Sequence, residues 1–391
     1  MRVAVVYGRR PSGHAAAAAA LEAGLRACGA ECFGVSAAED INPLLGPFLD
    51  KLYIGILEHC PWFWRAVYDR PAIAGAAGIF RRLYWRLRAA EVLDAIERIK
   101  PDVLVCTHAA PLSVLALGRR FGLVRPKLVA CPTDYDVHSF WLCPEVDLYL
   151  APSAASAWRL AASGIGRMRI VDAGIPIGEE FARPLDKAAA RRGLGLPERG
   201  PVLLLSGGSR GLGRLRDAAF ALLQEFPQAR VAVLCGENRR LWSALRAPLP
   251  FQSRLEPYLR ADRSLVRRLA AASDLLIGKA GGVTLAEASA AGLPVIFWET
   301  LPGQEERNAR FWLGAGAAGQ ARSMRELLRT VADLLGNPAE ARRLREKAAV
   351  LSRPRAAWTG AQAVLSLGNA RQEKPEVRGA SAGSESLPGA L

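Results

Sequence analysis

The chain has 391 residues, which is too long for one ordinary core and predicts two domains of under about two hundred residues each. Hydrophobic residues make up 51% of it and charged residues 23%, a balance that excludes a wholly disordered chain. The formal net charge of +15 predicts attraction to polyanions: nucleic acid, anionic lipid headgroups or phosphorylated substrates. A basic surface that is merely solvated would give the same composition, so charge alone does not choose among these partners.

The cysteines and the apolar runs bear on the compartment. The seven cysteines are scattered and contain no C-x-x-C pair, so they indicate neither a disulfide framework nor a zinc site and fit a reducing cytoplasm. The first apolar run ends at Gly8, Arg9 and Arg10, too early for a signal-peptide core, and no run approaches the length of a membrane span. We therefore expect any membrane contact to be peripheral.

Apolar, β-branched segments alternate with helical patterns along the chain, which is typical of parallel sheets. The strands expected in the first half are Val3–Tyr7, Val103–Cys106, Leu128–Cys131 and Val146–Leu150. Those expected in the second half are Val202–Leu205, Val231–Cys235, Leu275–Ile277 and Val295–Trp298. Each half is therefore expected to form a doubly wound α/β sheet.

A stretch rich in Gly and Pro, from Asp172 to Pro184, lies between the two series of strands and predicts the linker. We expect a first domain over residues 1–175, a linker over 176–184 and a second domain over 185–368. Helical periodicity from Pro338 to Leu367 predicts a terminal helix that packs back across the first domain. Residues 369–391 contain Gly, Ser, Pro and charge with almost nothing to bury, which predicts a disordered tail.

The turn after the first expected strand, from Gly8 to His14, has the glycine spacing of a P-loop. His14 and Ala15 stand where a P-loop has Lys and Ser or Thr, so the sequence does not indicate an NTPase. The turn instead puts a histidine at a helix N-terminus, at the carboxyl end of the sheet, where an unperturbed pKa of ~6.5 suits a base. The alternative is that His14 only caps the helix.

The segment from Asn42 to Arg88 combines aromatic and basic residues. It includes PWFW at residues 61–64 and IFRRLYWRLR at residues 79–88. On a helix, one face would carry Phe80, Leu83, Tyr84 and Leu87, and the other would carry arginines. This is the pattern of a helix at the headgroup boundary of an anionic membrane. The alternative is a core helix with a solvated basic face.

Two turns in the second half follow expected strands and contain glycine. Residues 205–213 (LSGGSRGLG) open a helix and would direct backbone N–H groups at a diphosphate, and CGEN at residues 235–238 ends the next strand in the same crevice. The candidate donor-binding residues of these turns are Gly207, Gly208, Ser209, Gly236 and Asn238.

The most informative segment is GKAGGVTLAE at residues 278–287. Gly281 and Gly282 would let a phosphate approach the helix N-terminus, and Glu287 could accept both ribose hydroxyls. Thr284 and Glu287 also have the spacing of a capping box, and the two interpretations are compatible. The following turn, PGQEERN at residues 302–308, carries amide and carboxylate groups suited to sugar hydroxyls, although acids in a first helical turn are common for dipole reasons.

In this order, KAGGVTLAEA, AAGLPVIF and GQEERNA resemble the UDP-sugar domain shared by monogalactosyldiacylglycerol synthases, processive diacylglycerol glucosyltransferases and the transferase that adds N-acetylglucosamine to lipid I. SGHAAAAAAL, PDVLVCTHAAP and TDYDVHSFW are similar to the diacylglycerol branch in particular. The ordered set spans about residues 1–367 and is more specific than any one motif. The resemblance implies the GT-B fold: two doubly wound Rossmann-like α/β domains facing across a cleft, with a C-terminal helix packing back on the first domain.

The resemblance also implies a role for each matching residue. Glu287 would bind the ribose, and Gln304 and Glu305 would contact the donor sugar with support from Asn308. His14 is the candidate base, and Asp134, a second catalytic candidate, would line the acceptor side with His138. The residues implied near the diphosphate are Gly207, Gly208, Ser209, Gly281, Gly282 and Thr284.

The family inverts the anomeric carbon by single displacement and needs no metal at the diphosphate, because helix N-termini and basic groups stabilise the departing UDP. We therefore expect UDP-glucose or UDP-galactose as donor, 1,2-diacylglycerol as acceptor, and no cofactor, metal or nucleic acid. Asp134 and Asp136 imitate a D-x-D metal motif but fall in the wrong domain. The implied location is the cytoplasmic face of the cell membrane, peripherally bound to anionic membrane lipids.

Two alternatives stay open at this stage. One is N-acetylglucosaminyl transfer to a polyprenyl-diphosphate lipid, against which the basic aromatic segment and TDYDVHSFW argue. The other is a non-catalytic protein that binds polyanions or lipids, which would show salt-sensitive polyanion binding without affinity for UDP. The presence of His14, Glu287, Gln304 and Glu305 argues against it.

Overall fold

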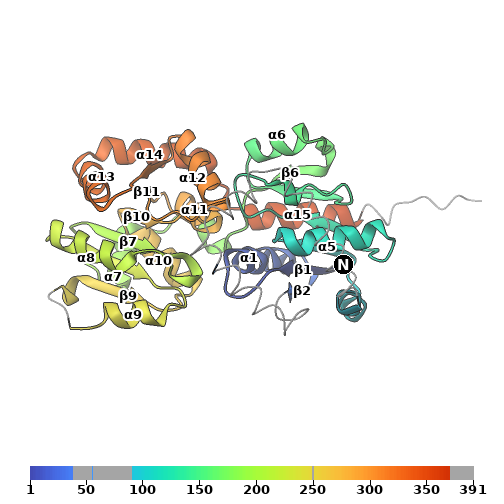
Figure 1. Cartoon of the computed structure of the whole chain (residues 1–391), viewed down its shortest axis with the longest axis horizontal. Coiled ribbons are helices and arrows are strands. Elements are labelled where there is room, and N and C mark those ends of the chain that lie inside the picture. Colours follow the sequence, from blue (N-terminus) through green and yellow to red (C-terminus); the bar gives the residue numbers. More distant parts are fainter. Residues whose placement is uncertain (38–54, 56–89, 249–250, 370–391) are drawn as a thin grey trace, which may run out of the picture.

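The computed structural model describes residues 1–37, 55, 90–248 and 251–369, which form two α/β domains lying side by side (Figure 1). The first domain contains a parallel sheet in the order β2 (Glu31–Ser36), β1 (Arg2–Tyr7), β3 (Val103–Cys106), β4 (Lys127–Ala130), β5 (Leu148–Ala151) and β6 (Ile170–Asp172). The second contains a parallel sheet in the order β12 (Ala318–Gln320), β11 (Val295–Phe297), β10 (Leu275–Gly278), β7 (Val202–Ser206), β8 (Arg230–Leu234) and β9 (Leu255–Tyr258). The predicted fold class is confirmed.

Helices connect the strands. Those that follow the strands of the first sheet are α1 (Gly13–Ala27), α5 (Ala109–Arg120) and α6 (Ala154–Ala162), and residues 90–99 are also helical. Those of the second domain are α7 (Lys187–Gly193), α8 (Leu215–Glu225), α9 (Arg239–Leu245), α10 (Arg263–Ala272), α11 (Gly282–Ala290), α12 (Gln304–Gly314), α13 (Met324–Gly336) and α14 (Pro338–Leu351), and α15 (Ala356–Asn369) ends the described chain. Short 3₁₀ turns are η2 (Ser139–Trp141), η3 (Arg167–Arg169), η4 (Glu179–Ala182), η5 (Gly208–Arg210) and η6 (Gln252–Arg254).

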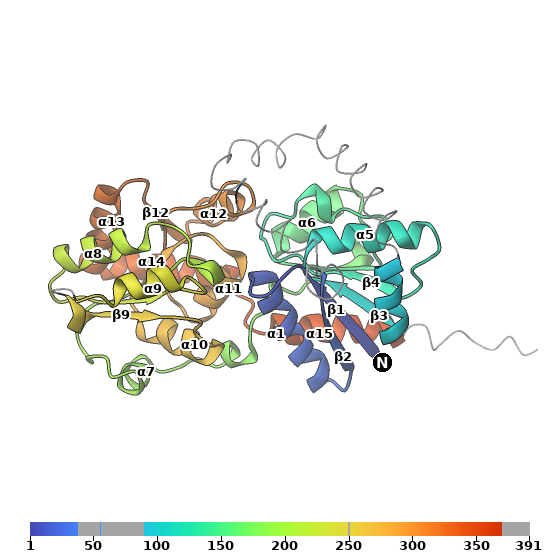
Figure 2. The same cartoon turned by 60° about the horizontal axis from the view of Figure 1, so that its bottom comes forward.

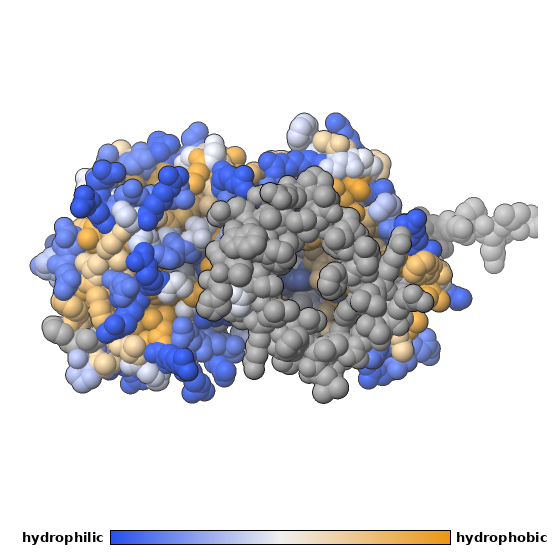
Figure 3. All heavy atoms as spheres, viewed as in Figure 1, coloured by the Kyte–Doolittle hydropathy of each residue, from blue (hydrophilic) through white to orange (hydrophobic). Residues whose placement is uncertain are grey.

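Both faces of each sheet are buried. Along β1, Ala4 and Val6 enter one apolar cluster while Val3 and Val5 enter another on the opposite face, as the alternation of side chains along a strand requires. The strands of the second sheet divide between two clusters in the same way. In the space-filling view, hydrophilic side chains are spread over the outer rim of both domains with hydrophobic ones set between them (Figure 3). The cores are thus sandwiched between helical layers, as doubly wound sheets demand.

Four strands were not predicted, and all four lie at the edges of the sheets: β2, β6, β9 and β12. Each leaves most of its residues partly or fully exposed, whereas β3, β5, β7 and β10 are buried throughout. An edge strand has a neighbour on one side only and needs no continuous apolar run, so apolar patterning does not reveal it.

The single terminal helix predicted from Pro338 to Leu367 is wrong in one respect, because it is two helices, α14 and α15. The break at residues 352–355 contains Pro354, which cannot continue a helix and disfavours the helical conformation of the residue before it. α14 packs against α11 and α13 in the second domain, while α15 crosses to the first and packs against α1 (Figures 1 and 2). A Cβ on Gly24 of α1 would lie 2.8 Å from the backbone oxygen of Ala357, so glycine permits this close approach.

The carboxyl ends of the two sheets face each other. The strand order reverses between β1 and β3 in the first sheet and between β7 and β10 in the second. α1, which follows β1, packs against α11, which follows β10. There the backbone oxygen of Thr133, after β4, lies against Gly282 at the start of α11, where a Cβ would come within 2.0 Å of it. Ligands of doubly wound sheets bind at such switch points, so both sites come together here.

Two predicted features lie outside the described residues. They are the basic aromatic segment from Asn42 to Arg88, apart from Gly55, and the tail beyond Asn369. The proposed domain boundaries at residues 175 and 185 also stay predictions. In the part of the chain that the structure covers, no helix is both long and apolar enough to cross a membrane.

Candidate active site

His14 is held at the start of α1 by residues from two other turns of the first domain. The helix is capped by Ser12, whose Oγ accepts the backbone N–H of Ala15 at 3.1 Å, so the alternative role of His14 as the cap is wrong. His14 Nδ1 lies 2.9 Å from the backbone oxygen of Thr107 and 2.7 Å from Thr133 Oγ1. Because a carbonyl oxygen only accepts, the proton belongs on Nδ1, which leaves the Nε2 lone pair as the basic atom.

Asp134 is the charged neighbour of His14. Burial lowers the pKa of His14 from its ordinary value, and the Asp134 carboxylate opposes that shift. The pKa of Asp134 is raised by burial, against the opposing effects of His14 and of a hydrogen bond from Asn308. A neutral imidazole beside a carboxylate can take a proton and have the resulting positive charge stabilised.

His108 is a residue of this site that sequence reasoning missed as a candidate. It caps α5, because its Nδ1 accepts the N–H of Ala110 at 3.1 Å, which places its own proton on Nε2. Its ring meets that of His14 edge-on, with centroids 4.5 Å apart, and a Cβ on Gly8 would lie 3.2 Å from it. Burial lowers the pKa of His108 to about 3, with a further contribution from His14. The signal was available, since a histidine two residues after a buried strand lies at the carboxyl edge of the sheet.

Asn308 of α12 bridges the domains. Its fully buried amide accepts the N–H of Tyr135 at 2.8 Å and donates to Asp134 Oδ1 at 2.8 Å and to the Ala280 oxygen at 3.0 Å. The ring of Tyr135 stacks on Phe311 of the same helix, with centroids 5.3 Å apart. The structure therefore places Asn308 between the turn after β4 in the first domain and the turn before α11 in the second, where it fixes Asp134.

The two aspartates of the D-x-D pattern face different partners. Asp134 binds Asn308, while Asp136 pairs with Arg159 and, at 3.3 Å, with Arg307 of the second domain. His138, predicted to line the acceptor side, is buried and caps the η2 turn, where its Nδ1 accepts the N–H of Phe140 at 3.2 Å. Among the described residues, no group of three or more His, Cys, Asp or Glu side chains could hold a metal.

The turns after β7 and β8 pack backbone to backbone. Gly211 and Gly236 both have left-handed φ, and a Cβ on either would lie 2.1 to 2.3 Å from a carbonyl oxygen of the facing turn. Asn238 ties the turns together, because its Nδ2 donates to the Gly211 oxygen at 3.0 Å while its Oδ1 caps α9. The glycine turn does not open a helix directly as predicted, since the short 3₁₀ turn η5 lies within it and α8 begins only at Leu215. The two packed turns together hold Gly207, Gly208 and Ser209 at the switch point.

α11 begins at the same switch point with its N-terminus uncapped by a side chain. Its N-cap is Gly281, and Thr284 lies inside the first turn, so the capping box predicted for Thr284 and Glu287 is wrong. An N-cap glycine leaves the first N–H groups of the helix without a side-chain acceptor. Those groups are suited to a phosphate, and Gly282 sets them directly beside Thr133 and hence beside His14.

Glu287 lies one turn further along α11. Burial raises the pKa of its carboxyl to about 7; Arg263 lowers it and Glu180 raises it further. Within the described part of the chain this carboxyl forms no hydrogen bond or ion pair, and Arg263 donates instead to the backbone oxygen of Ala16. The carboxyl is thus available to accept hydroxyl groups of a ligand.

Glu305, predicted to contact the donor sugar, is paired in the structure with Lys279. Lys279 Nζ lies 2.7 Å from Glu305 Oε1, and Oε2 accepts the N–H of Leu301 at 3.2 Å. Lys279 is a second residue that the sequence did not single out. Gln304, the other predicted sugar contact, is the first residue of α12 and follows Gly303, the N-cap, whose φ is 85°.

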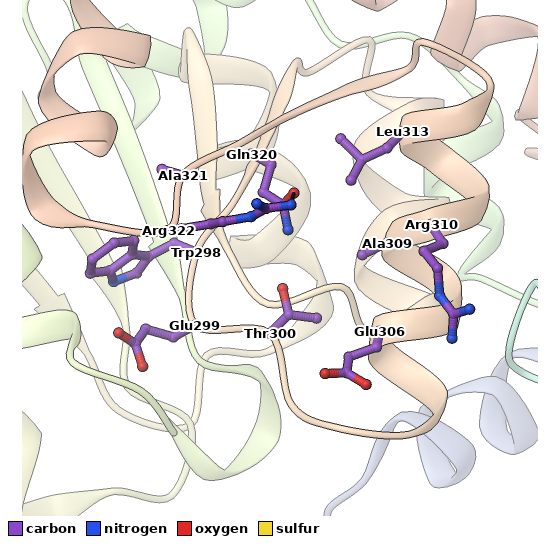
Figure 4. A pocket seen from close by; sticks show the side chains of 10 residues that line it. All are labelled: Trp298, Glu299, Thr300, Glu306, Ala309, Arg310, Leu313, Gln320, Ala321 and Arg322. Atoms are coloured by element: carbon purple, nitrogen blue, oxygen red, sulfur yellow. Dashed lines mark hydrogen bonds between the residues drawn. The ribbon is translucent and has the colours of Figure 1, made fainter. Parts of the chain in front are cut away.

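A separate cavity of about 720 Å³ lies on the other flank of α12 (Figure 4). Helical spacing puts Glu306, Ala309, Arg310 and Leu313 on this flank, facing the ends of β11 and β12, while Glu305 and Asn308 lie on the buried side. None of the predicted site residues lines the cavity. The arrangement that brings them together is instead the domain interface around His14, Asp134 and α11.

Comparisons with known proteins bear on this arrangement. A family model described as monogalactosyldiacylglycerol (MGDG) synthase matches residues 14–177. The processive diacylglycerol beta-glucosyltransferase of Bacillus licheniformis is 28% identical over 308 residues, covering 76% of this chain and 77% of that protein. The probable monogalactosyldiacylglycerol synthase 3 of Oryza sativa subsp. japonica is 32% identical over 285 residues, covering 69% of this chain and 55% of that protein. The chain is a relative of these diacylglycerol glycosyltransferases.

Solved structures agree on the fold of this diacylglycerol glycosyltransferase relative. The S. aureus MnaA–UDP complex superposes with a TM-score of 0.62 at 14% identity, covering 97% of this chain and all of the other. MurG of Acinetobacter baumannii superposes with a TM-score of 0.56 at 16% identity, covering 93% of this chain and 99% of that one. At such low identity these likenesses bear on the fold alone, and they agree with two Rossmann-like domains.

Proposed function

We propose that the protein transfers a hexose from UDP-glucose or UDP-galactose to 1,2-diacylglycerol, with inversion at the anomeric carbon, and so makes a β-glycosyldiacylglycerol for membrane glycolipids. The observation that carries the proposal is His14, whose Nδ1 is held by Thr107 and Thr133 while its Nε2 lone pair stays basic at the domain interface. The diacylglycerol transferases and synthases to which the chain is similar support the acceptor class.

His14 acts as the general base in this proposal. The acceptor hydroxyl gives its proton to Nε2 as its oxygen bonds to the anomeric carbon, and the bond from that carbon to the β-phosphate oxygen breaks with its electrons leaving on UDP. Asp134, held in place by Asn308, stabilises the imidazolium that forms. The balance is one UDP-sugar and one alcohol in, and one glycoside, one UDP and one proton out.

The second domain binds the donor. The first turn of α11 takes the diphosphate on its backbone N–H groups, with no cofactor or metal in the proposed reaction. Glu287 accepts the two ribose hydroxyls, for which its carboxyl is available. α12 begins next to this turn and presents Gln304 and Glu305 to the sugar.

The test is an activity assay with the full chain. Purified protein is incubated with anionic liposomes that contain diacylglycerol and with a panel of UDP-sugars, with and without EDTA, and both UDP release and glycolipid are measured. One donor should yield a β-linked glycolipid by proton NMR whether or not EDTA is present, and His14→Gln should lower turnover by about 10²-fold or more. An α-linked product would contradict inversion, and near-native turnover of the variant would place the base elsewhere.

The same assay separates the other candidate functions. If only a polyprenyl-diphosphate acceptor were glycosylated, the acceptor assignment would be wrong and the donor assignment right. Binding of liposomes without binding of any UDP-sugar would favour a non-catalytic lipid-binding protein. The peripheral location on anionic lipids is part of the proposal, and co-sedimentation with liposomes of graded anionic content measures it directly.

A further inference from the structure

Lys279 lies between the two parts of the donor site. It directly follows β10, at the switch point of the second sheet, and its stem crosses the turn after β7. A Cβ on Gly208 would lie 2.6 Å from Lys279 Cε and 3.2 Å from Nζ, so the end of the Lys279 side chain lies directly against this glycine. The ammonium then reaches Glu305 in the first turn of α12 at 2.7 Å. One cation therefore touches both the proposed diphosphate turn and the proposed sugar helix.

The Lys279 ammonium of this ion pair can form further hydrogen bonds. An ammonium carries three N–H donors, and in the described part of the chain Lys279 has one ion-pair partner, Glu305. The pair is largely buried, with side-chain exposures of 17% for Lys279 and 10% for Glu305. In such a place each charge needs the other, because either one alone would be buried without compensation.

A diphosphate bound at the turns after β7 and β10 would compete with Glu305 for the Lys279 ammonium. It brings negative charge next to the ammonium, which attracts Lys279 and repels the Glu305 carboxylate. A carboxylate freed from its ion pair becomes an acceptor for hydroxyl groups, the role that the sequence predicted for Glu305. The observed pair and the predicted sugar contact then belong to two states of the same site.

We propose that Lys279 is a catalytic residue that exchanges Glu305 for the donor diphosphate, releasing Glu305 to the sugar; this inference rests on the function proposed above. As the bond from the anomeric carbon to the β-phosphate oxygen breaks, the electron pair stays on that oxygen. Lys279 stabilises the added charge on UDP, while the proton of the acceptor hydroxyl goes to His14. After UDP leaves, Lys279 pairs with Glu305 again.

The test is whether substitutions of Lys279 and of Glu305 change UDP affinity in opposite directions. Calorimetry measures the Kd of UDP and of uridine, which lacks phosphate, for the full-length wild type, Lys279→Gln and Glu305→Gln. Lys279→Gln should weaken UDP roughly 10-fold or more, because a charge-assisted contact is lost, and Lys279→Arg should restore most of the affinity. Glu305→Gln should tighten UDP several-fold, because the competing carboxylate is gone. Uridine should bind all variants equally, which also reports that the domain is folded.

Turnover and a matched control complete the experiment. Both Lys279→Gln and Glu305→Gln should lower kcat, the first by about 10²-fold. Lys187→Gln removes another ion pair of the second domain, 2.5 Å long with Asp274, and should leave UDP binding unchanged. A purely structural pair would weaken UDP in both variants or shift uridine as much as UDP, and either result overturns the inference. A wild type that binds no UDP would instead refute the proposed function itself.

Discussion

Asn308→Leu is the substitution whose effect follows most directly from the structure. Leucine has the branched shape of asparagine and is somewhat larger, so the change removes hydrogen bonds without opening a cavity. Three are lost at a fully buried position: from the N–H of Tyr135, to the Asp134 carboxyl and to the Ala280 oxygen. The two to neutral peptide groups are worth about 1 kcal/mol each and the one to a carboxyl about 2 kcal/mol, which sums to about 4 kcal/mol.

Urea unfolding followed by tryptophan fluorescence measures this loss. The matched control is Asn337→Ala, because Asn337 is exposed and only caps α14, where its Oδ1 accepts one N–H; its loss should cost about 1 kcal/mol. Asn308→Leu should also lower kcat, since Asp134 loses the group that fixes it beside His14. If Asn308→Leu destabilised the protein no more than Asn337→Ala, the amide would not bind the domains together and the reasoning would be refuted.

Substitutions at three further positions test the chemistry of the site. Asp134→Asn removes the charge that raises the pKa of His14, so the acid limb of the kcat/KM profile should move to lower pH while kcat falls. An unmoved limb would contradict the pairing. His108→Asn keeps an acceptor to cap α5 but removes the ring beside His14, so kcat should drop roughly 10-fold with little change in KM for the donor, whereas His108→Ala should also lower stability. The pKa of the Glu287 carboxyl is raised to about 7 in the folded protein. Between the ordinary pKa of a glutamate and 7, the folded state therefore binds a proton that the unfolded state does not. Above that range the carboxyl is ionised in both states, and its burial destabilises the fold of the donor-free protein. Glu287→Gln should therefore raise Tm at pH 8 and not at pH 4.5, while it weakens UDP binding; an unchanged Tm at pH 8 would mean that the carboxyl is not strained by burial.

The sequence predicted those parts of the fold that follow from apolar runs. The eight expected strands are present within one or two residues at each end because they are buried on both faces and must be apolar throughout. The sequence did not predict the edge strands β2, β6, β9 and β12, because an edge strand needs no such apolar run. Pro354 marks the break before α15, but the apolar periodicity on either side of it favours one continuous helix.

Local sequence could indicate which candidate residues lie at the carboxyl edges of the sheets, but not how they pair. Turns and polar residues after strands indicated His14, Glu287 and Glu305, and the family resemblance added Asp134. That Asn308 binds Asp134, 174 residues away, depends on how the two domains meet, and no local pattern encodes it. The pairing of Glu305 with Lys279 depends likewise on the approach of α12 to the end of β10.

The residues that break local rules lie where the proposed ligand binds. α11 begins with a glycine cap although Thr284 was near enough in sequence to supply a capping oxygen, so its first N–H groups stay free of side-chain acceptors. Glu287 is held with a raised pKa and no hydrogen-bonding partner among the described residues, at a position where an apolar or amide side chain would avoid the cost of burying a charge. Neither the glycine cap nor the buried carboxyl stabilises the folded chain in the absence of a ligand. Donors for an anion and an acceptor for hydroxyls, left vacant one helical turn apart, are what a nucleoside diphosphate requires.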